Sequence, residues 1–363
     1  MSKLPCLSLT LHSVPSNFST AAIYGDQNNT NGTVQQQCPG AEMKGWYFTV
    51  LPVYILLITV LGIVLNVFVL MVFCFHKKAC TVAEIYLSNL AAADLVLMSC
   101  LPFWAAYVSN GFNWPFGVFL CKVINMGINM NAYSSIYFLI LVSVDRYVAL
   151  VHPLSHGRMR RPKYAKLGCL LVWCFGLLLS CPTFVFREVK HYPDYNITVC
   201  YLDYPNHTVQ LVSDGMLIVF GFIIPIFIIS YCTLKIIQAL NNRLMLNTQR
   251  MEQMATTLVL VVLLAFMICW VPFHVVRILE ALLKAEVLSG CSITSILNTC
   301  KNIFMYLAFF NSVLNPILYV IVGENFRKKV RKVFKQWSTD RTTTLNTTFT
   351  RSKLLRSIKA VSS

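Results

Sequence analysis

The chain has 363 residues, of which 56% are hydrophobic and only 12% are charged, and its formal net charge is +16. A soluble domain usually contains about 25% charged residues, so this composition excludes an ordinary soluble protein and indicates several membrane spans. The basic residues gather in a few segments next to apolar ones, which argues against a nucleic-acid partner.

Seven apolar segments are each long enough to cross the ~30 Å hydrocarbon core of a bilayer as a helix. They cover residues 47–75, 83–108, 118–150, 166–186, 209–239, 254–283 and 294–322. The predicted fold is an all-α membrane protein, a bundle of seven transmembrane helices within residues 46–322. An odd number of spans places the two termini on opposite sides of the membrane.

Lysine and arginine are concentrated after the first, third and seventh spans, whereas acids and bases nearly balance in the other loops. By the positive-inside rule the basic segments are cytosolic and the N-terminus lies outside. The same basic excess favours contact with anionic membrane lipid.

The polar residues 1–45 are expected to form an extracellular, glycosylated tail. Five sequons lie on the side assigned to the outside, where they are expected to be glycosylated. These sites are Asn17, Asn28, Asn31, Asn196 and Asn206.

Four cysteines on the outer side are candidates for the disulfides that can form there. We expect Cys121, at the start of the third span, to pair with Cys200 in the second outer loop. We expect Cys38, in the N-terminal tail, to pair with Cys291 in the third outer loop. Both bridges would shape the outer vestibule.

Polar side chains inside membrane spans are costly and usually functional. Asp94 is an acid deep in the second span, and Asn131 and Ser135 lie four residues apart on one face of the third. The expected group comprises Asp94, Asn131, Ser135, Asn311 and Ser312. This set predicts an allosteric sodium site and no other cofactor. A hydrogen-bond network without an ion is the alternative, and a proton relay is a third option that lacks a second buried acid.

Each of the last three spans contains a proline, Pro225, Pro272 or Pro316. Proline removes a backbone hydrogen bond and kinks a helix. Because large aromatic residues stand beside these kinks, we expect helices that can pivot.

The seven spans carry the segments LAAAD, DRY, CWVP and NPILY in this order. This arrangement resembles rhodopsin-class (class A) G-protein-coupled receptors, and the resemblance covers about residues 45–335. The resemblance implies a plasma-membrane receptor and not an enzyme, with Arg146 as the switch arginine clamped by Asp145. The remaining implied switch residues are Tyr147, Glu252, Phe266, Trp270, Pro272, Asn315, Pro316 and Tyr319. One position departs from the family, because Thr233 stands where span five usually has a tyrosine, and Tyr231 precedes it by two residues.

Two ligand classes are disfavoured by the resemblance. Ile128 stands where amine receptors have an aspartate, and Phe309 stands where opsins have a lysine. The long glycosylated tail and the large second outer loop suit a peptide receptor instead.

Longer segments of the sequence include HKKACTVAEIYLSNLAAADLVL, LPFWAAYVSN, SVDRYVALVHPLSHGRMR and VIVGENFRKK. These segments are similar to bradykinin (kinin) receptors. The similarity is nearer the B2 type, although VHPL and PTF are B1-like. It implies a short kinin with arginine near its ends, a q-class G protein, phospholipase C and calcium release. Another short vasoactive or chemotactic peptide, angiotensin- or chemokine-like, is the alternative ligand. A seven-span transporter is the non-receptor alternative.

B2-type receptors hold a ligand arginine with two acids at the tops of spans six and seven. Glu280 keeps the first acid, whereas the second aligns with Asn298. The expected ligand-binding residues are Glu280, Asn298, Arg277, Phe273, His274, Trp104, Asn129 and Lys301. We expect Glu280 to pair with the basic end of the peptide, the alternative being a solvated charge at the rim. Asp194, Asp203 or Asp214 is expected to offset the extra bases.

Residues 323–336 place Phe326, Val330, Val333 and Phe334 on one face, which predicts an interfacial amphipathic helix. The cytosolic tail, residues 337–363, is rich in Ser and Thr and resembles a segment that receptor kinases phosphorylate and arrestin binds. The alternative is a disordered polar segment without this role. The predicted phosphorylation sites are Ser338, Thr339, Thr342, Thr343 and Thr344.

Overall fold

The computed structural model describes residues 47–75, 80–152, 161–193, 196–244, 250–284, 287, 291–324, 326–336 and 338. Several predicted sites lie outside these residues, namely Asn17, Asn28, Asn31, Cys38, Asp194, Thr339, Thr342, Thr343 and Thr344. The side chains of Glu252, Cys291 and Asn298 are also outside the description. The predictions that rest on these residues stay predictions.

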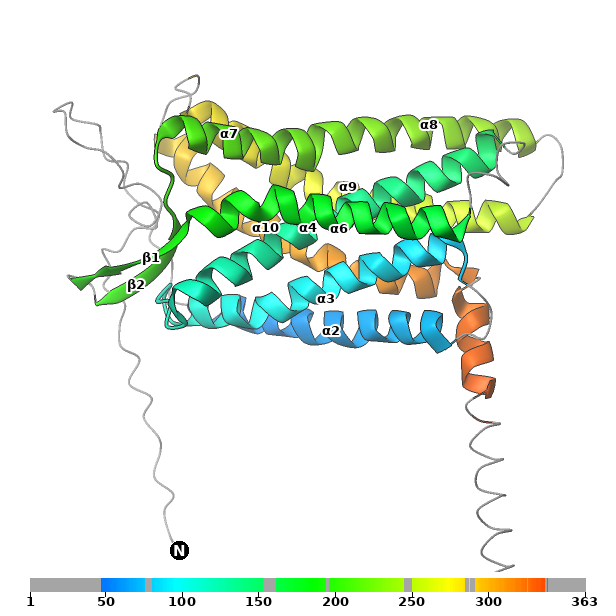
Figure 1. Cartoon of the computed structure of the whole chain (residues 1–363), viewed down its shortest axis with the longest axis horizontal. Coiled ribbons are helices and arrows are strands. Elements are labelled where there is room, and N and C mark those ends of the chain that lie inside the picture. Colours follow the sequence, from blue (N-terminus) through cyan, green and yellow to red (C-terminus); the bar gives the residue numbers. More distant parts are fainter. Residues whose placement is uncertain are drawn as a thin grey trace, which may run out of the picture.

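Within the described residues, seven long helical segments run side by side along the length of the molecule (Figure 1). The first four are α2 (Tyr47–Phe75), α3 (Val82–Ser109), α4 (Gly117–Val151) and α6 (Pro162–Phe186). The fifth combines α7 (His207–Ile218), η2 (Val219–Ile223) and α8 (Ile224–Leu244), followed by α9 (Arg250–Lys284) and α10 (Cys291–Ile321). All seven are long and apolar enough to cross a membrane, which confirms the predicted fold.

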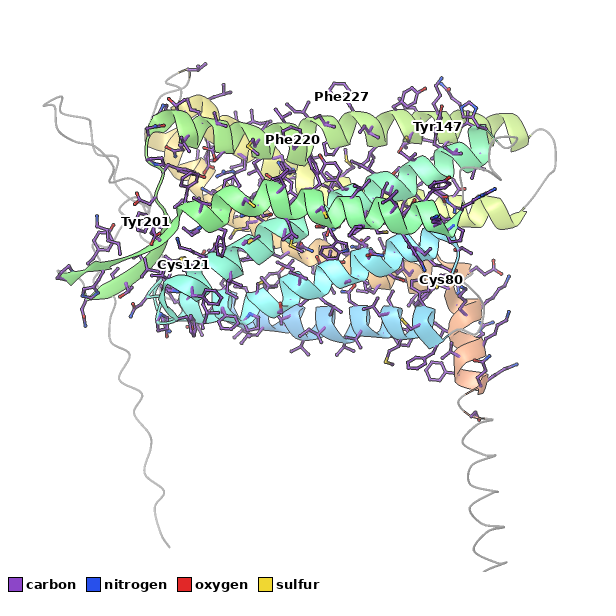
Figure 2. All side chains as sticks on the ribbon, viewed as in Figure 1. Cys80, Cys121, Tyr147, Tyr201, Phe220 and Phe227 are labelled. Atoms are coloured by element: carbon purple, nitrogen blue, oxygen red, sulfur yellow. A yellow bond between two sulfur atoms is a disulfide. The ribbon has the colours of Figure 1, made fainter. Side chains whose placement is uncertain are left out.

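The outer faces of these helices carry large apolar side chains. Val53, Val60 and Val64 on α2 are exposed, and Phe227 on α8 is 72% exposed (Figure 2). Contiguous apolar surface of this extent is not stable in water. The polar side chains described below lie inside the bundle, so the hydrophobic exterior is the surface that faces lipid.

A two-stranded hairpin lies at one end of the bundle, here called the hairpin end (Figure 1). Strand β1 (Arg187–Tyr192) pairs antiparallel with β2 (Ile197–Leu202), and Val189 stands opposite Cys200. Asn196, just before β2, has φ of 50°, a left-handed conformation that asparagine tolerates better than most residues. The sequence predicted this segment only as a large loop.

The opposite end, here called the DRY end, contains Asp145, Arg146 and Tyr147 at the end of α4. A short helix over residues 326–336 follows α10 and runs across the ends of the bundle helices (Figure 1). Phe326 anchors this helix, because its ring lies 5.6 Å from that of Phe73 and 6.1 Å from that of Tyr319, measured between centroids. The predicted helix after the seventh span is confirmed.

The fifth span is irregular just before Pro225. Residues Val219–Ile223 form a π-helical turn, which holds an additional residue relative to an α-helix. Pro225 lacks an N–H and cannot continue the regular backbone hydrogen-bond pattern. The Tyr137 hydroxyl donates to the carbonyl oxygen of Phe220 at 2.9 Å, so a side chain of α4 satisfies part of the irregular turn.

Candidate functional site

A polar cluster surrounds Asp94 in the middle of the bundle, and Asp94 itself is fully buried. Its Oδ1 accepts hydrogen bonds from the Ser312 hydroxyl at 2.8 Å and the Asn131 amide at 3.2 Å. Its Oδ2 accepts from the Asn315 amide at 3.1 Å, and Ser135 donates to Oδ1 at 3.4 Å. The carboxylate therefore joins α3, α4 and α10.

Buried asparagine side chains add further oxygen atoms to this cluster. Asn66 donates to the Ser312 carbonyl oxygen at 3.0 Å, which places α2 against the same cluster. Among the described residues, the buried Oδ1 atoms of Asn66, Asn311 and Asn315 have no hydrogen-bond partner. Carboxylate, hydroxyl and amide oxygens suit a hard cation such as sodium. The residues present would fit the ion: Asp94 would be the charged ligand, and Ser135, Ser312 and the asparagines would be neutral ones.

At the DRY end, Arg146 folds onto its neighbour Asp145. The Arg146 Nη2 atom lies 2.7 Å from Asp145 Oδ2, and the two side chains are 11% and 4% exposed. Because water is largely excluded from this pair, loss of one partner would leave the other charge poorly compensated, which is strongly destabilising. The Tyr147 hydroxyl lies 3.0 Å from His152 Nε2, outside this pair.

Span five departs from the family pattern at Thr233, and the side chains of Thr233 and Tyr231 lie on opposite faces of α8. The hydroxyl of Thr233 is buried and, within the described part of the chain, has no hydrogen-bond partner. Tyr231 is 54% exposed, with its ring 5.8 Å from that of Tyr147. Tyr231 therefore does not replace the tyrosine that Thr233 displaces. The hydroxyl of Tyr319 on α10 is also buried without a partner among the described residues.

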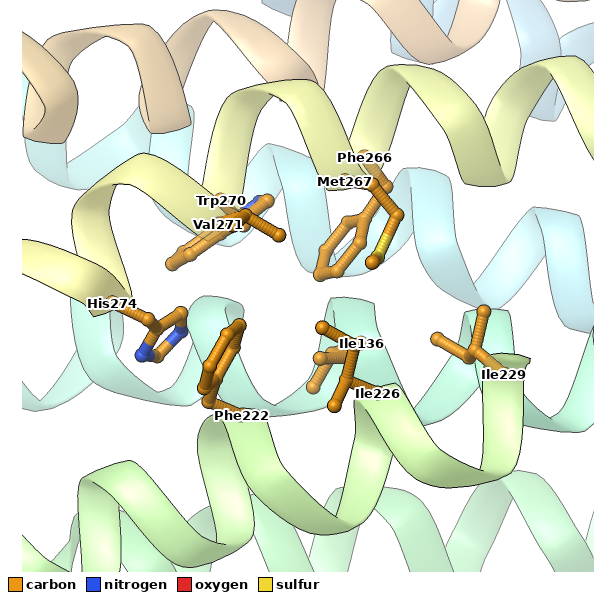
Figure 3. A pocket seen from close by; sticks show the side chains of 9 residues that line it. All are labelled: Ile136, Phe222, Ile226, Ile229, Phe266, Met267, Trp270, Val271 and His274. Atoms are coloured by element: carbon orange, nitrogen blue, oxygen red, sulfur yellow. The ribbon is translucent and has the colours of Figure 1, made fainter. Parts of the chain in front are cut away.

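Large aromatic side chains stack between the cluster and the hairpin end. The Phe266 ring stacks on Trp270 at 5.8 Å, Trp270 stacks on His274 at 5.9 Å, and His274 stacks on Phe222 at 4.9 Å. These rings, with Met267, line an apolar cavity of about 10 Å³ (Figure 3). Pro272 lies within the same part of α9. The stack links η2 to α9 at the level of both proline irregularities.

At the hairpin end, the predicted bridge between Cys121 and Cys200 is present, with 5.9 Å between the Cα atoms. The Trp114 N–H donates to the Thr198 carbonyl oxygen at 2.7 Å, and Asn113 Oδ1 accepts from the Thr198 N–H at 2.9 Å. One covalent and two backbone-directed contacts therefore fix the hairpin against α4 and the turn before it.

Four charged residues near the hairpin end form a continuous ion-pair network, defined here as Asp214, Arg277, Glu280 and Lys301. Arg277 lies 2.8 Å from Asp214 and 3.1 Å from Glu280, and Lys301 lies 3.0 Å from Glu280. Their side chains are only 12–19% exposed. The network joins α7, α9 and α10, and Glu280 is not a solvated rim charge. Asp214 is the acid that pairs with one of the two extra bases.

Tyr204 lies beside this network, before α7. Burial raises the pKa of Tyr204, and the nearby charges of Asp214 and Arg277 act on it in opposite directions. The phenol therefore stays neutral at physiological pH and keeps a proton to donate. No motif in the sequence pointed to this residue, because a tyrosine in a loop is common.

The other expected ligand-binding residues lie at different depths. Asn129 donates to the Thr183 hydroxyl at 2.9 Å, and Trp104 Nε1 lies 3.5 Å from the Tyr306 hydroxyl. The Phe273 ring lies 5.4 Å from the His274 ring, and His274 is only 2% exposed. His274 thus belongs to the aromatic stack, below the ion-pair network.

An ion pair at the hairpin end that is separate from this network was not anticipated. Lys122, at the start of α4, lies 2.7 Å from Glu188 in β1. Its side chain is 20% exposed, whereas that of Glu188 is 42% exposed. Both residues are ordinary charged residues of loops or helix ends, and only the position of the hairpin brings them together.

Asn196 and Asn206 lie at the hairpin end. Asn206 caps α7, accepting from the Val209 N–H at 2.9 Å through its side-chain oxygen. Ser338 is itself helical and lies close to the end of residues 326–336. Glycosylation and phosphorylation of these residues stay predictions.

Residues 65–319 match the family described as 7 transmembrane receptor (rhodopsin family). The chain is 46% identical to the B2 bradykinin receptor of Homo sapiens, over 91% of its own length and 86% of that receptor. It is 47% identical to the B2 bradykinin receptor of Oryctolagus cuniculus, over 84% and 85% of the two chains. It is 40% identical to the B1 bradykinin receptor of Homo sapiens, over 79% and 82%.

These matches confirm the expected resemblance, including its lean toward the B2 type, and they exclude the transporter alternative. Together with the seven spans and the buried polar and charged clusters, they show a receptor and not an enzyme. The chain belongs to the rhodopsin family of seven-transmembrane receptors, in which it is similar to bradykinin receptors over most of its length.

Proposed function

We propose that this protein is a plasma-membrane receptor for a kinin-like peptide. Binding of the peptide activates a q-class G protein, phospholipase C and calcium release, and receptor kinases and arrestin end the signal. The observation that carries this proposal is the ion-pair network at the hairpin end, in a chain whose relatives are bradykinin receptors. It supplies partly buried acids and bases in the place where a peptide with charged ends would enter.

In this proposal the hairpin end faces outward and the DRY end faces the cytosol. The disulfide at the hairpin end supports this orientation, because such bonds form in oxidising compartments. The sequons at Asn196 and Asn206 and the basic helix over residues 326–336 support it as well. Residues 1–45 would then be the outer tail, and residues 337–363 would be the cytosolic tail.

The switch proposed for the DRY end is the pair of Arg146 and Asp145. Activation would release Arg146 from Asp145, and the aromatic stack of Phe266, Trp270 and His274 would carry the movement from the peptide to this end. Both α9 and α10 contain a proline inside the helix, at Pro272 and Pro316, which supports bending at these points.

The direct test is to express the full chain in cells that lack kinin receptors and to record cytosolic calcium after adding a panel of kinin peptides. A response at nanomolar concentration that a q-class inhibitor abolishes is expected. A response only to angiotensin- or chemokine-like peptides would contradict the ligand class. A response that persists through the inhibitor would contradict the transducer.

A further inference from the structure

The short helix over residues 326–336 is strongly basic. It contains no acid, and its six bases are Arg327, Lys328, Lys329, Arg331, Lys332 and Lys335. The helix runs across the ends of the bundle helices at the DRY end (Figure 1). Like charges three or four residues apart on a helix destabilise it. Anionic partners, from inside the protein or from outside it, are therefore needed to offset this repulsion.

The first turn of this helix finds its partners inside the protein. Arg327 Nη1 donates to a backbone carbonyl oxygen near the end of α10 at 2.9 Å. Lys328 lies 2.8 Å from Glu324, and Lys329 lies 2.6 Å from Glu84. These three bases are thus already engaged.

The second half of the helix differs from the first. Arg331 and Lys332 are exposed, and within the described part of the chain neither has an ion-pair partner. Positions 328, 331, 332 and 335 are three or four residues apart, so their side chains lie on one face of the helix. This face carries positive charge that the described residues do not neutralise.

Apolar side chains of the same helix have two different surroundings. Phe326 and Val333 are only 5% and 4% exposed and pack toward the bundle, whereas Phe334 is 55% exposed. An exposed ring beside bases suits the boundary between lipid headgroups and acyl chains. Residues 301–363 contain no cysteine, so no thioester-linked fatty acid can anchor this helix to the membrane.

The exposed bases and the exposed ring line one open hollow of about 500 Å³. Its lining residues are Lys328, Val330, Arg331, Lys332, Phe334 and Lys335. Four of these side chains are cationic and two are apolar. The hollow therefore suits a group that carries several negative charges and is joined to hydrocarbon.

A lipid headgroup with several phosphates meets this description better than an ordinary anionic lipid. Phosphatidylserine carries a single net negative charge and cannot neutralise Arg331 and Lys332 together. A phosphoinositide carries phosphate monoesters, which an arginine can bind through two parallel hydrogen bonds and a lysine as a point charge. Clusters of Lys and Arg next to the cytosolic end of a membrane helix are typical of sites for such headgroups.

We propose that the basic face of residues 328–335 binds the headgroup of a phosphoinositide in the cytosolic leaflet, with Arg331 and Lys332 as its principal phosphate ligands and Phe334 in the acyl-chain boundary. The bound lipid holds the helix at the membrane surface, where no fatty acid can be attached. This inference goes beyond the proposed function and shares with it only the cytosolic orientation of the DRY end.

The test measures lipid binding to the purified full chain in detergent, without peptide, by native mass spectrometry. Phosphatidylinositol bisphosphate and phosphatidylserine are titrated separately at matched total negative charge. The unchanged receptor should bind the phosphoinositide at least about tenfold more tightly, which corresponds to about 1.4 kcal/mol. In the double variant Arg331→Gln with Lys332→Gln this preference should fall below about threefold.

Arg161→Gln with Lys163→Gln is the matched control. These residues are also an exposed arginine and an exposed lysine at the DRY end, but they lie at the start of α6. The control removes the same charge and should retain the full preference. Arg331→Lys with Lys332→Arg keeps both charges and should retain it as well. Thermal unfolding establishes that each variant is folded.

Equal affinity of the unchanged receptor for the two lipids would overturn the inference. An equal loss of preference in the Arg161 and Lys163 control would also overturn it, because the effect would then be one of net charge. Soluble inositol trisphosphate that binds as tightly as the lipid would show a site for free phosphates and not for a membrane lipid. No peptide is present, so a receptor that responds to no kinin contradicts the proposed function and leaves this inference standing.

Discussion

Lys329, on the short helix that follows α10, lies 2.6 Å from Glu84 in the first turn of α3, measured from Nζ to Oε1. The two side chains are 16% and 13% exposed. The other oxygen of Glu84 accepts a hydrogen bond from the Thr81 N–H at 3.0 Å, as part of a capping box. One carboxylate thus caps α3 and also holds the helix of residues 326–336 against the bundle.

Lys329→Gln should lower the free energy of unfolding of the purified receptor by about 1.5–3 kcal/mol, the range for hydrogen bonds to charged groups. Because the pair is shielded from water, it should stabilise the receptor more than an exposed surface salt bridge does. Thermal unfolding in detergent measures the effect.

Lys328→Gln is the control for this variant. Lys328 pairs with Glu324 at 2.8 Å, but the side chains are 48% and 32% exposed. Its loss should cost less than about 1 kcal/mol, as for most surface salt bridges. Equal losses in the two variants would show that the burial of the Lys329 pair adds nothing.

Ser312→Ala should reduce the effect of sodium on agonist binding. Ser312 donates to Asp94 at 2.8 Å and would be a neutral ligand of the ion. In the unchanged receptor, agonist affinity measured on membranes should fall when sodium chloride replaces choline chloride. The fall should be smaller in Ser312→Ala and absent in Asp94→Asn, because a neutral amide no longer compensates the cation.

Ser143→Ala is the matched control for the sodium experiment. Ser143 is fully buried in α4, and its hydroxyl donates to the Leu139 carbonyl oxygen at 2.8 Å, so it is a hydroxyl outside the Asp94 cluster. Its sodium response should match that of the unchanged receptor. If the unchanged receptor shows no sodium response, the cluster is the hydrogen-bond network without an ion.

The ends of most spans could be predicted from the sequence because apolar length decides them. The first predicted span, 47–75, coincides with α2, whereas α6 begins at Pro162 and not at 166. Lys163 and Lys166 had marked that stretch as loop. Proline is favoured in the first turn of a helix, where its missing N–H costs nothing, and it begins this one.

The contacts of the candidate site were less predictable than its residues. Arg277, Glu280 and Lys301 were singled out one by one, but their pairing depends on how α9 and α10 are rotated about their axes. The hairpin and its pair of Lys122 with Glu188 depend on the course of a loop. The periodicity of apolar residues does not determine either, because every face of a membrane helix is largely apolar.

Glu280→Gln should weaken the binding of a kinin peptide at least about tenfold, since a charge-assisted hydrogen bond contributes roughly 1.5–3 kcal/mol. The variant also leaves Arg277 and Lys301 near the entering cation with one acid fewer. Competition binding on membranes measures the change. Glu188→Gln removes an acid at the same end whose side chain is 42% exposed, and it should change affinity less than about threefold. Unchanged affinity in Glu280→Gln would remove this residue from the binding site.

Thr233→Tyr should increase signalling. Thr233 and Tyr319 both have buried hydroxyls without hydrogen-bond partners in the described part of the chain. The resemblance to the family implies a tyrosine at the Thr233 position, and we expect its hydroxyl to reach that of Tyr319 through a water molecule in the active receptor. A neutral hydrogen bond contributes roughly 0.5–1.5 kcal/mol, so restoring the link should raise basal inositol phosphate production or agonist potency by about twofold to tenfold.

Two control variants test whether the effect of Thr233→Tyr comes from the link to Tyr319 or from any change at this part of α8. Thr233→Val keeps the shape of threonine without its hydroxyl and should leave potency unchanged, because that hydroxyl has no partner within the described residues. Tyr231→Phe removes a hydroxyl from a side chain that is 54% exposed and should also have little effect. If Thr233→Tyr signals no better than the unchanged receptor although it reaches the surface, the missing tyrosine does not limit activation. Helix movement in this receptor would then be stabilised by contacts other than the Tyr319 hydroxyl.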